Sequence, residues 1–274
     1  MLWIGGPPGS GKTTAASILA RRHGLRLYSA DTRTWKHRDR AIAAGNPAAL
    51  RWESLASDLR RSQPADELLA MSLHVERGQM VVDDVGALPN APLVIAEGSV
   101  IRPADLPSGS VAVWLMPPVG VQAQRLRTRD GQRVPLYELL AEVIAGEVAV
   151  AGARVVVARD PSQVVAELEM LFAERLARGP VAQSVDERRA LLREANLDIV
   201  DQVQGYYAQP WAQGDPEAVV RSFICECTVT TCESFVASSV GLAAARPVIE
   251  AGRKLPDAAV AKAYRHVRGP CRRG

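Results

Sequence analysis

The chain has 274 residues, a formal net charge of +3 and an apolar fraction of 47%. This length allows one large domain or one domain with an appendage, and the small positive charge suits anions such as nucleotides without indicating a nucleic-acid partner. No apolar run approaches the roughly 20 residues that span a bilayer, and the first residues do not form a signal peptide. We therefore expect a cytoplasmic protein without membrane segments, whose four cysteines are free thiols or metal ligands.

A glycine-rich segment near the amino terminus fits the pattern G-x-x-x-x-G-K-[ST]. An apolar run, Leu2–Gly5, precedes this segment, and a helix-forming run, Lys12–His23, follows it. Glycines let backbone N-H groups approach a polyphosphate, and the start of the helix adds partial positive charge. The sequence predicts a nucleotide-binding loop made of Gly6, Pro7, Pro8, Gly9, Ser10, Gly11, Lys12, Thr13 and Thr14.

Lys12 and Thr13 have different expected roles in this loop. Lys12 is expected to reach the β- and γ-phosphates and to act in catalysis, and the Thr13 hydroxyl is expected to coordinate Mg²⁺. ATP and Mg²⁺ are therefore the expected ligands. An ordinary glycine-rich turn capped by Thr13 is the alternative.

Two carboxylates follow predicted strands. Residues 25–29 and 92–96 are typical of buried strands, and Asp31 and Glu97 come after them. Ligands bind at the carboxyl ends of the strands in open α/β sheets. We expect Asp31 or Glu97 to orient the hydroxyl of an acceptor, and Glu97 is also a candidate contact of Mg²⁺. The alternatives are a helix cap at Asp31 and a cap or turn at Glu97.

Residues 80–84 have two interpretations. An apolar run that ends in two aspartates is typical of the acidic strand of ATPases, in which Asp83 would anchor the metal. Val81, Val85 and Leu88, however, recur at helical spacing, and residues 92–96 form the better strand. The first interpretation favours an ATPase or a nucleotide-driven switch that acts on a partner.

A helix after the predicted strand Val111–Met116 carries several arginines. Guanidinium groups on a mobile helix can cover the phosphates, neutralise the transferring group and exclude water. We therefore expect Arg125 and Arg129 to be catalytic lid residues, and Arg133 can join them. A solvated helix surface is the alternative.

The order of predicted elements defines the fold class. Strands and helices alternate up to the turn signal at residues 178–180, with a last strand at residues 153–158 and a last helix at residues 162–176. This alternation predicts an α/β fold with a parallel sheet and helices on both faces. We expect one domain at residues 1–178 and a small α+β appendage at residues 179–274.

The predicted appendage contains a long amphipathic helix at residues 183–208 and a hairpin with strands at residues 222–227 and 232–236. Cys225, Cys227 and Cys232 are close enough in sequence to chelate one Zn²⁺, with Cys271 or His266 as a fourth ligand. Structural zinc sites usually show paired C-x₂-C spacing, so reduced thiols are the interpretation we favour at this point.

Residues 1–177 resemble the small-molecule kinases of the P-loop NTPase fold, a group that includes nucleoside monophosphate, shikimate and gluconate kinases and antibiotic phosphotransferases. The matching features are the loop at residues 6–13, Asp31, the segment Ala96-Glu97-Gly98, and Arg125-Leu126 with Arg129, which resembles the R-L-x-x-R lid helix. The resemblance implies transfer of the γ-phosphoryl group of ATP to a small-molecule hydroxyl or phosphate.

The chain also departs from well-defined members of this group. Residues 11–14 are Gly-Lys-Thr-Thr instead of G-K-G-T, and Asp31 lacks the Asp-x-Asp pair of shikimate kinases. These differences leave the acceptor open. The whole chain resembles uncharacterised actinobacterial proteins that join such a kinase-like part to a cysteine-bearing tail.

Overall fold

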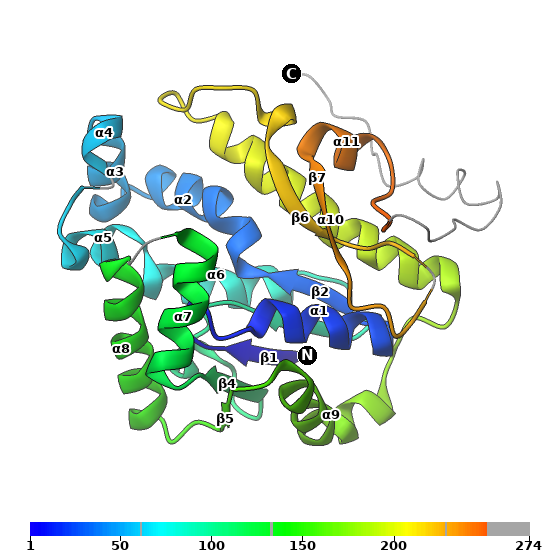
Figure 1. Ribbon diagram of the computed structural model, residues 1–274. Coiled ribbons are helices and arrows are strands. Elements are labelled where there is room, and N and C mark those ends of the chain that lie inside the picture. The colour runs from blue at the N-terminus through cyan, green and yellow to red at the C-terminus, as the bar shows by residue number, and fades with distance from the viewer. Residues whose placement is uncertain (61, 132–133, 228, 251–274) are drawn as a thin grey trace.

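A five-stranded parallel sheet lies at the centre of the protein (Figure 1). The computed structural model describes residues 1–60, 62–131, 134–227 and 229–250. The strand order is β2-β3-β1-β4-β5, which confirms the predicted α/β fold. The strands are β1 (Leu2–Gly5), β2 (Arg26–Ser29), β3 (Val94–Glu97), β4 (Val111–Met116) and β5 (Val155–Val157).

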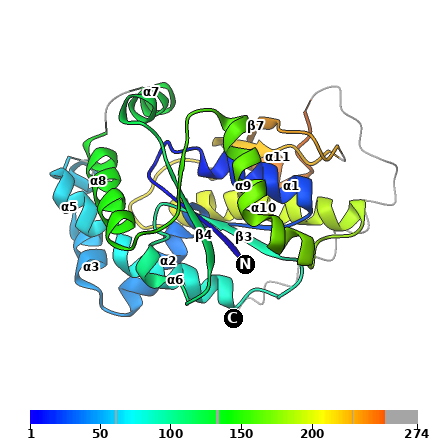
Figure 2. The same cartoon turned by 90° about the horizontal axis from the view of Figure 1, so that it is seen from below.

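Alternation of side chains along β1 explains why helices cover both faces of the sheet. Leu2 and Ile4 belong to the core under α1 (Lys12–His23) and α9 (Pro161–Arg178). Trp3 belongs to the opposite core, under α6 (His74–Gly86) and α8 (Pro135–Val150). Figure 2 shows α1 and α9 on one side of the sheet and α6 on the other. The predicted helices on both faces are therefore confirmed.

Short helices connect β2 with β3 and lie on the side of the sheet toward which β1 runs (Figure 1). They are the 3-10 helix η1 (Ala30–Arg33), α2 (Thr34–Ala43), α3 (Pro47–Ser54), α4 (Ser57–Arg60) and α5 (Ala65–Met71).

The parallel register brings the ends of three strands to one edge. Glu97, the last residue of β3, lies beside Ile4 of β1 and Ser29 of β2. Gly5 lies beside Trp114 of β4. The first residues of the predicted phosphate loop and Glu97 therefore leave the sheet side by side.

The strand interpretation of residues 80–84 is wrong, because these residues lie within α6. Val81 and Val85 are buried one helical turn apart, against the sheet, whereas the side chain of Asp83 is half exposed. The spacing of four residues between buried valines is that of a helix face. The neighbours of β1 are β3 and β4, so no second acidic strand is formed by residues 80–84.

The tail packs along the edge of the sheet. Its long helix α10 (Val185–Tyr207) begins with a capping box formed by Ser184 and Glu187 and runs beside β2. Leu192 and Ala195 of α10 join the core on the α1 side of the sheet. The antiparallel strands β6 (Val220–Ile224) and β7 (Phe235–Ser239) and the helix α11 (Val240–Ala245) pack on α10 (Figure 1).

The predicted extents of the two hairpin strands are wrong. Strand β6 ends at Ile224 and β7 begins at Phe235, so Cys225, Cys227 and Cys232 lie in the connecting loop. The backbone of Glu226 pairs with Val248 at 2.7 Å instead of continuing the hairpin. Cys271, His266 and Arg133, which were named as candidate ligands or lid residues, lie outside the described residues. The boundary between residues 178 and 179 stays a prediction.

Within the described segments, none of the helices is both long and apolar enough to cross a bilayer.

Candidate active site

The loop between β1 and α1 requires glycine at defined positions. Gly6, Gly9 and Gly11 have φ angles of 139°, 78° and 90°, which residues with a Cβ rarely adopt. A Cβ on Gly6 would lie 2.5 Å from the carbonyl oxygen of Leu115, and one on Gly9 would lie 3.1 Å from Cγ of Leu126. Both backbone conformation and packing therefore exclude larger residues at Gly6 and Gly9.

Two polar side chains of this loop are buried with few partners. Lys12 is 5% exposed, and its Nζ donates to the carbonyl oxygen of Pro7 at 3.4 Å. The Oγ atom of Ser10 is buried and has no hydrogen-bond partner within the described chain. An unsatisfied buried polar group costs about 1–3 kcal/mol. A phosphate at the start of α1 would supply the missing acceptors, so these residues fit an anion.

Helix α7 (Val119–Asp130) forms hydrogen bonds with the loop between β1 and α1. The Nε2 atom of Gln122 donates to the carbonyl oxygen of Pro8 at 2.9 Å. Arg125 Nη1 donates to the carbonyl oxygens of Gly9 at 3.3 Å and Ser10 at 3.2 Å. These bonds direct the carbonyl oxygens of Pro8, Gly9 and Ser10 toward α7.

The two arginines that were expected to form a lid have different positions. Arg125 contacts the phosphate loop, and its Nη2 also donates to the carbonyl oxygen of Arg159 at 2.7 Å. Arg129 is exposed, and its guanidinium carbon lies 5.3 Å from the centre of the Tyr137 ring on α8. Closure of either arginine over a triphosphate stays a prediction.

Glu97 is the centre of an oxygen cluster beside the loop. Its side chain is fully buried, Oε2 accepts a hydrogen bond from Thr13 Oγ1 at 3.1 Å, and Oε1 accepts one from Ser29 Oγ. Burial raises the pKa of Glu97, and the negative charge of Asp31 raises it further, although Lys12 and the two hydroxyls oppose these effects. Mg²⁺ prefers oxygen ligands such as these, so Thr13, Ser29 and Glu97 fit a magnesium ion.

Asp31 lies in η1, two residues after Ser29, and is exposed. The cap interpretation of Asp31 is wrong, because the residues that precede η1 and α2 are Ser29 and Arg33. The turn that carries Asp31 is fixed by Arg77, a buried side chain of α6 whose Nη2 donates to the carbonyl oxygen of Ala30 at 2.7 Å.

A cavity of about 190 Å³ lies between Asp31 and the tail. The described lining contains hydroxyl, carboxylate and apolar side chains and no Lys, Arg or His. The carboxylate of Asp198 in the wall pairs with Arg33 at 2.6 Å, and burial raises the pKa of Asp198 to about 6. The lining residues are Thr13, Ser17, Leu27, Ser29, Asp31, Thr32, Ala195, Asp198, Ile199, Ser222, Ile224 and Phe235.

A larger cavity of about 390 Å³ lies elsewhere, between the start of α10 and residues 180–183. No residue of the phosphate loop lines it. Arginines in its wall have carboxylate partners, because Arg26 pairs with Glu194 and Arg189 with Asp186. The smaller cavity, which includes Thr13, is therefore the better candidate for an acceptor site.

Sequence reasoning missed several residues of this site. Ser29, at the end of β2 and two residues before Asp31, is the one for which a local signal exists, namely a hydroxyl at the carboxyl end of a strand. Gln122, Arg77 and Asp198 reach the site from distant helices, and the sequence contains no pattern that brings them together. Thr14 of the predicted loop is exposed in the first turn of α1.

The sheet is parallel with the strand order 2-3-1-4-5, and the predicted phosphate loop follows its central strand. No family model and no curated protein matches this sequence.

Several solved structures are similar to part of the chain. Shikimate kinase from Acinetobacter baumannii, solved with shikimate, is 15% identical with a TM-score of 0.41 and covers 64% of this chain and 94% of its own. A sugar kinase from Janibacter sp. is 19% identical with a TM-score of 0.34, covering 65% and 97%. An uncharacterized protein from Eubacterium ventriosum is 10% identical with a TM-score of 0.34, covering 64% and 98%.

Proposed function

We propose that this protein is an ATP-dependent phosphotransferase that moves the γ-phosphoryl group to a hydroxyl of a small acceptor in the cytoplasm. The supporting observation is that the phosphate loop, the Thr13-Ser29-Glu97 oxygen cluster and the cavity beside Asp31 share one edge of the sheet. Phosphoryl transfer needs these components in contact, because catalysis depends on positioning and on electrostatic stabilisation.

The loop residues bind the triphosphate in this proposal. Backbone N-H groups of residues 9–13 and the ammonium of Lys12 contact the phosphates, and Ser10 Oγ gains an acceptor. Thr13 and Glu97, with Ser29, hold Mg²⁺, which when bound neutralises charge on the phosphate oxygens. Arg125 keeps the loop backbone in place through the carbonyl oxygens of Gly9 and Ser10.

Asp31 receives the proton of the acceptor hydroxyl in this proposal. It lies on the wall of the 190 Å³ cavity together with Thr13, so an acceptor in this cavity lies next to the loop residue that holds Mg²⁺. Asp31 is exposed whereas Glu97 is fully buried, so Asp31 is better placed for proton exchange with an acceptor.

The cavity also restricts the chemistry of the acceptor. Its described lining carries two carboxylates and no cationic side chain, so a phosphorylated acceptor would meet repulsion without a partner. Pockets for drug-sized ligands have about 300–1,000 Å³, and this one is smaller. We infer a neutral or cationic acceptor of about one ring with hydroxyl groups, such as a sugar or an amino sugar, with Phe235 as an apolar wall.

The alternative function, an ATPase or switch, depended on residues 80–84 as a strand beside β1. These residues are helical, so Asp83 does not end a strand beside β1 as this alternative required. The cavity beside Asp31 and Thr13 offers space for an acceptor, which an ATPase does not need, so the kinase proposal is favoured.

Two variants test the proposal. Lys12→Ala is expected to abolish phosphoryl transfer and to weaken ATP binding while the fold is retained. Asp31→Asn is expected to lower acceptor-dependent turnover by about 100-fold or more, with unchanged affinity for Mg²⁺-ATP in calorimetry. Asp58→Asn, an exposed carboxylate of α4 outside the site, is the matched control. Full activity of Lys12→Ala would refute the proposal.

A further inference from the structure

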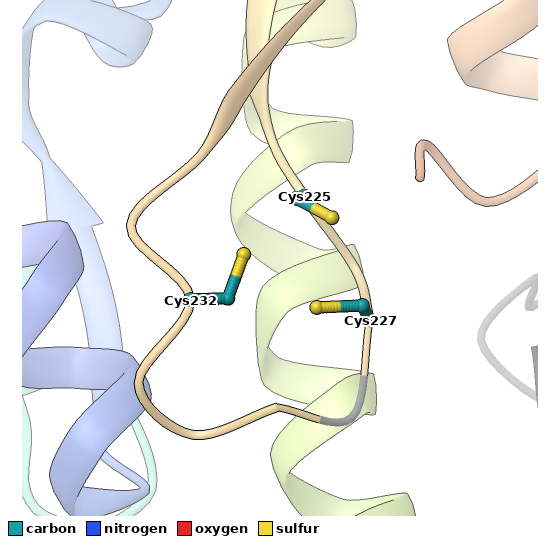
Figure 3. A group of neighbouring side chains, drawn as sticks. All are labelled: Cys225, Cys227 and Cys232. Atoms are coloured by element: carbon teal, nitrogen blue, oxygen red, sulfur yellow. The ribbon is translucent and has the colours of Figure 1, made fainter. Parts of the chain in front are cut away.

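Three cysteine side chains of the tail converge in the loop between β6 and β7. Figure 3 shows Cys225 and Cys227 on the arm that leaves β6 and Cys232 on the arm that returns to β7. Their Sγ atoms all lie within 4.8 Å of one another, and all three residues are buried. No disulfide joins these three cysteines.

The separation of the sulfur atoms is close to that of a metal site. Thiolates bind zinc at about 2.3 Å, so neighbouring sulfur atoms of a tetrahedron are roughly 3.8 Å apart. A contraction of the loop by about 1 Å or less therefore converts this cluster into a site with three ligands. Within the described segments no fourth His, Cys, Asp or Glu joins the group.

The loop is already held in a conformation that keeps the sulfur atoms together. Cys225 N donates to the carbonyl oxygen of Ser234 at 3.1 Å and Cys232 N to that of Val229 at 3.1 Å. The backbone N-H of Glu250 donates to Cys225 Sγ at 3.4 Å. A donor directed at sulfur stabilises a thiolate more than a thiol, so this contact suits a metal ligand.

A buried cation from the nucleotide-binding part of the chain contacts the cluster. Arg21, on the helix α1 that begins at the phosphate loop, is 5% exposed. Its Nη1 donates to the carbonyl oxygens of Cys227 at 3.0 Å and Val229 at 3.2 Å and lies 3.8 Å from Cys227 Sγ.

A second observation on Arg21 also points to a metal ion at the cysteines. Its Nη2 is buried without a hydrogen-bond partner in the described chain. A buried guanidinium beside three neutral thiols is costly when no carboxylate faces it, and within the described residues Arg21 forms no ion pair. Three thiolates with one divalent cation carry a net charge of −1, which a single arginine neutralises.

We propose that Cys225, Cys227 and Cys232 bind one Zn²⁺ ion through their thiolates, with water in the fourth position and Arg21 as the counter-charge. Thiolates select zinc over hard cations such as Mg²⁺ and Ca²⁺. The ion fixes the loop between β6 and β7, and the hydrogen bonds of Arg21 join this loop to α1, the helix that begins at the phosphate loop. This site is independent of the proposed phosphotransferase activity.

The first test uses the unmodified full chain. We expect elemental analysis of the purified protein to give one zinc per chain. After removal of zinc, Co²⁺ should bind with one equivalent and produce a thiolate-to-cobalt charge-transfer band together with the intense visible bands of tetrahedral cobalt. Stoichiometric Co²⁺ binding without the thiolate band, or no binding of either metal, would overturn the proposal. Because no substitution is needed, this test does not depend on the folding of a variant.

Cysteine variants identify the ligands. The triple change Cys225→Ser, Cys227→Ser and Cys232→Ser is expected to remove the bound zinc, whereas Cys271→Ser, which changes the remaining cysteine of the sequence, is expected to keep it. Retention of zinc by the triple variant, or its loss from Cys271→Ser, contradicts the assignment.

Arg21 is tested as a positioning residue against its neighbour. Groups that orient or balance metal ligands typically change metal affinity by about 10- to 100-fold when they are removed. We expect Arg21→Met to weaken zinc binding by about 10-fold or more, with the thiolate band of the Co²⁺ form retained. Arg22→Met is the matched control, because the guanidinium of Arg22 pairs with Glu233 of the same loop at 2.6 Å and with Glu169, and within the described residues it does not donate to sulfur. Equal zinc affinities of the two variants would contradict the role of Arg21.

Discussion

The buried position of Glu97 suits the binding of Mg²⁺, but burial of its negative charge destabilises the folded protein. A carboxylate that is fully buried beside Thr13 and Ser29 suits Mg²⁺, but without the ion only the ammonium of Lys12 and the two hydroxyls oppose the effect of burial on its pKa. The pKa of Glu97 is therefore raised. A carboxyl with a raised pKa contributes stability below its ordinary pKa of 4.5, and this contribution is lost as the pH rises through the folded value.

The isosteric change Glu97→Gln is expected to separate the effect of the carboxylate on activity from its effect on stability. Turnover should fall by about 100-fold or more, because a neutral amide is a poor ligand for Mg²⁺. In the absence of nucleotide and with a chelator present, the melting temperature at neutral pH should rise, because the variant no longer buries a charge. Thermal unfolding between pH 7 and pH 4 measures this difference, which should shrink toward acidic pH. A variant that is less stable than the wild type at neutral pH would contradict this explanation.

Gly6 is expected to be the least replaceable residue of the phosphate loop. Its φ angle is 139°, and an added Cβ would meet the carbonyl oxygen of Leu115 at 2.5 Å, a backbone atom that cannot rotate away. Gly6→Ala should destabilise the protein by more than about 1 kcal/mol and abolish binding of Mg²⁺-ATP.

Gly86 is the matched control for Gly6. It ends α6, and a Cβ there meets nothing within 4 Å. Gly86→Ala is expected to be neutral or to raise stability by up to about 1 kcal/mol, because alanine has the higher helix propensity. Denaturant unfolding of both variants measures the contrast, and equal losses would show that the contact with Leu115 does not decide the effect.

Helix α7 contacts the phosphate loop through side chains that lie about one helical turn apart. Gln122 and Arg125 both donate to loop carbonyls, and Leu126 packs against Gly9. Arg129, one turn further on, lies over Tyr137 of α8 instead. The side of α7 that carries Gln122 and Arg125 therefore sets the loop conformation.

We expect Arg125→Gln to raise the KM for ATP and to lower kcat/KM by about 10-fold or more, which is about 1.4 kcal/mol of lost positioning. Arg129→Gln should change both parameters by less than about threefold unless closure of the helix brings it to the triphosphate. Steady-state kinetics of the two variants distinguish these roles. A larger effect of Arg129→Gln than of Arg125→Gln would favour a lid that closes over the nucleotide and would contradict the positioning role of Arg125.

Helices α2 and α6 are joined by a partly buried network around Asp84. Its carboxylate accepts hydrogen bonds from Tyr28, His37 and Arg40, and Arg77 donates to the other nitrogen of His37 at 3.4 Å. Burial lowers the pKa of His37, and the charges of Arg77 and Arg40 contribute in the same direction against the opposing effect of Asp84. His37 is therefore neutral in the folded protein at neutral pH.

The lowered pKa of His37 makes stability depend on pH in a defined direction. Below the ordinary histidine pKa of 6.5, the unfolded chain takes up a proton that the folded state resists. Stability from this group is complete above pH 6.5 and is lost as the pH falls through the folded pKa. We expect the melting temperature to fall between pH 7 and pH 5.5, and His37→Gln to reduce this slope. The same slope in His37→Gln would assign the effect to other groups.

Elements with strong local patterns could be predicted from the sequence. Strand β1 and the start of α1 enclose a motif whose glycines and lysine have fixed spacing, and strand β4 is an apolar run stopped by prolines. Residues 80–84 were ambiguous because two aspartates after valines suit the end of a strand or the exposed face of a helix. The packing of Val81 and Val85 on the sheet decides between these alternatives, and this contact is not local.

At the scale of the whole molecule, the candidate site is shared between the part that contains the parallel sheet and the tail. The phosphate loop, Asp31 and Glu97 could be predicted to lie at one edge, because parallel strands place their carboxyl ends together. Asp198, Ser222 and Phe235, which follow Asp31 by more than 150 residues in the sequence, close the cavity of the candidate site. No motif links them to the loop, so their contribution follows from the packing of α10 and the hairpin along β2.

The same packing explains why the proposed zinc site could not be predicted from the sequence. The spacing of Cys225, Cys227 and Cys232 differs from that of common zinc motifs, so sequence alone favoured reduced thiols. The convergence of the sulfur atoms and the contact of Arg21 with Cys227 depend on how the tail lies against α1.

The central claim, that this chain transfers the γ-phosphoryl group to a hydroxylated acceptor, is tested most directly by following γ-labelled ATP. The wild-type protein is mixed with Mg²⁺ and, separately, with neutral sugars, amino sugars, nucleosides and phosphorylated sugars. We predict that a neutral sugar or an amino sugar accelerates ATP consumption and receives the label, and that Lys12→Ala abolishes both effects. Release of the label only as inorganic phosphate, at a rate that no acceptor changes, would contradict the claim.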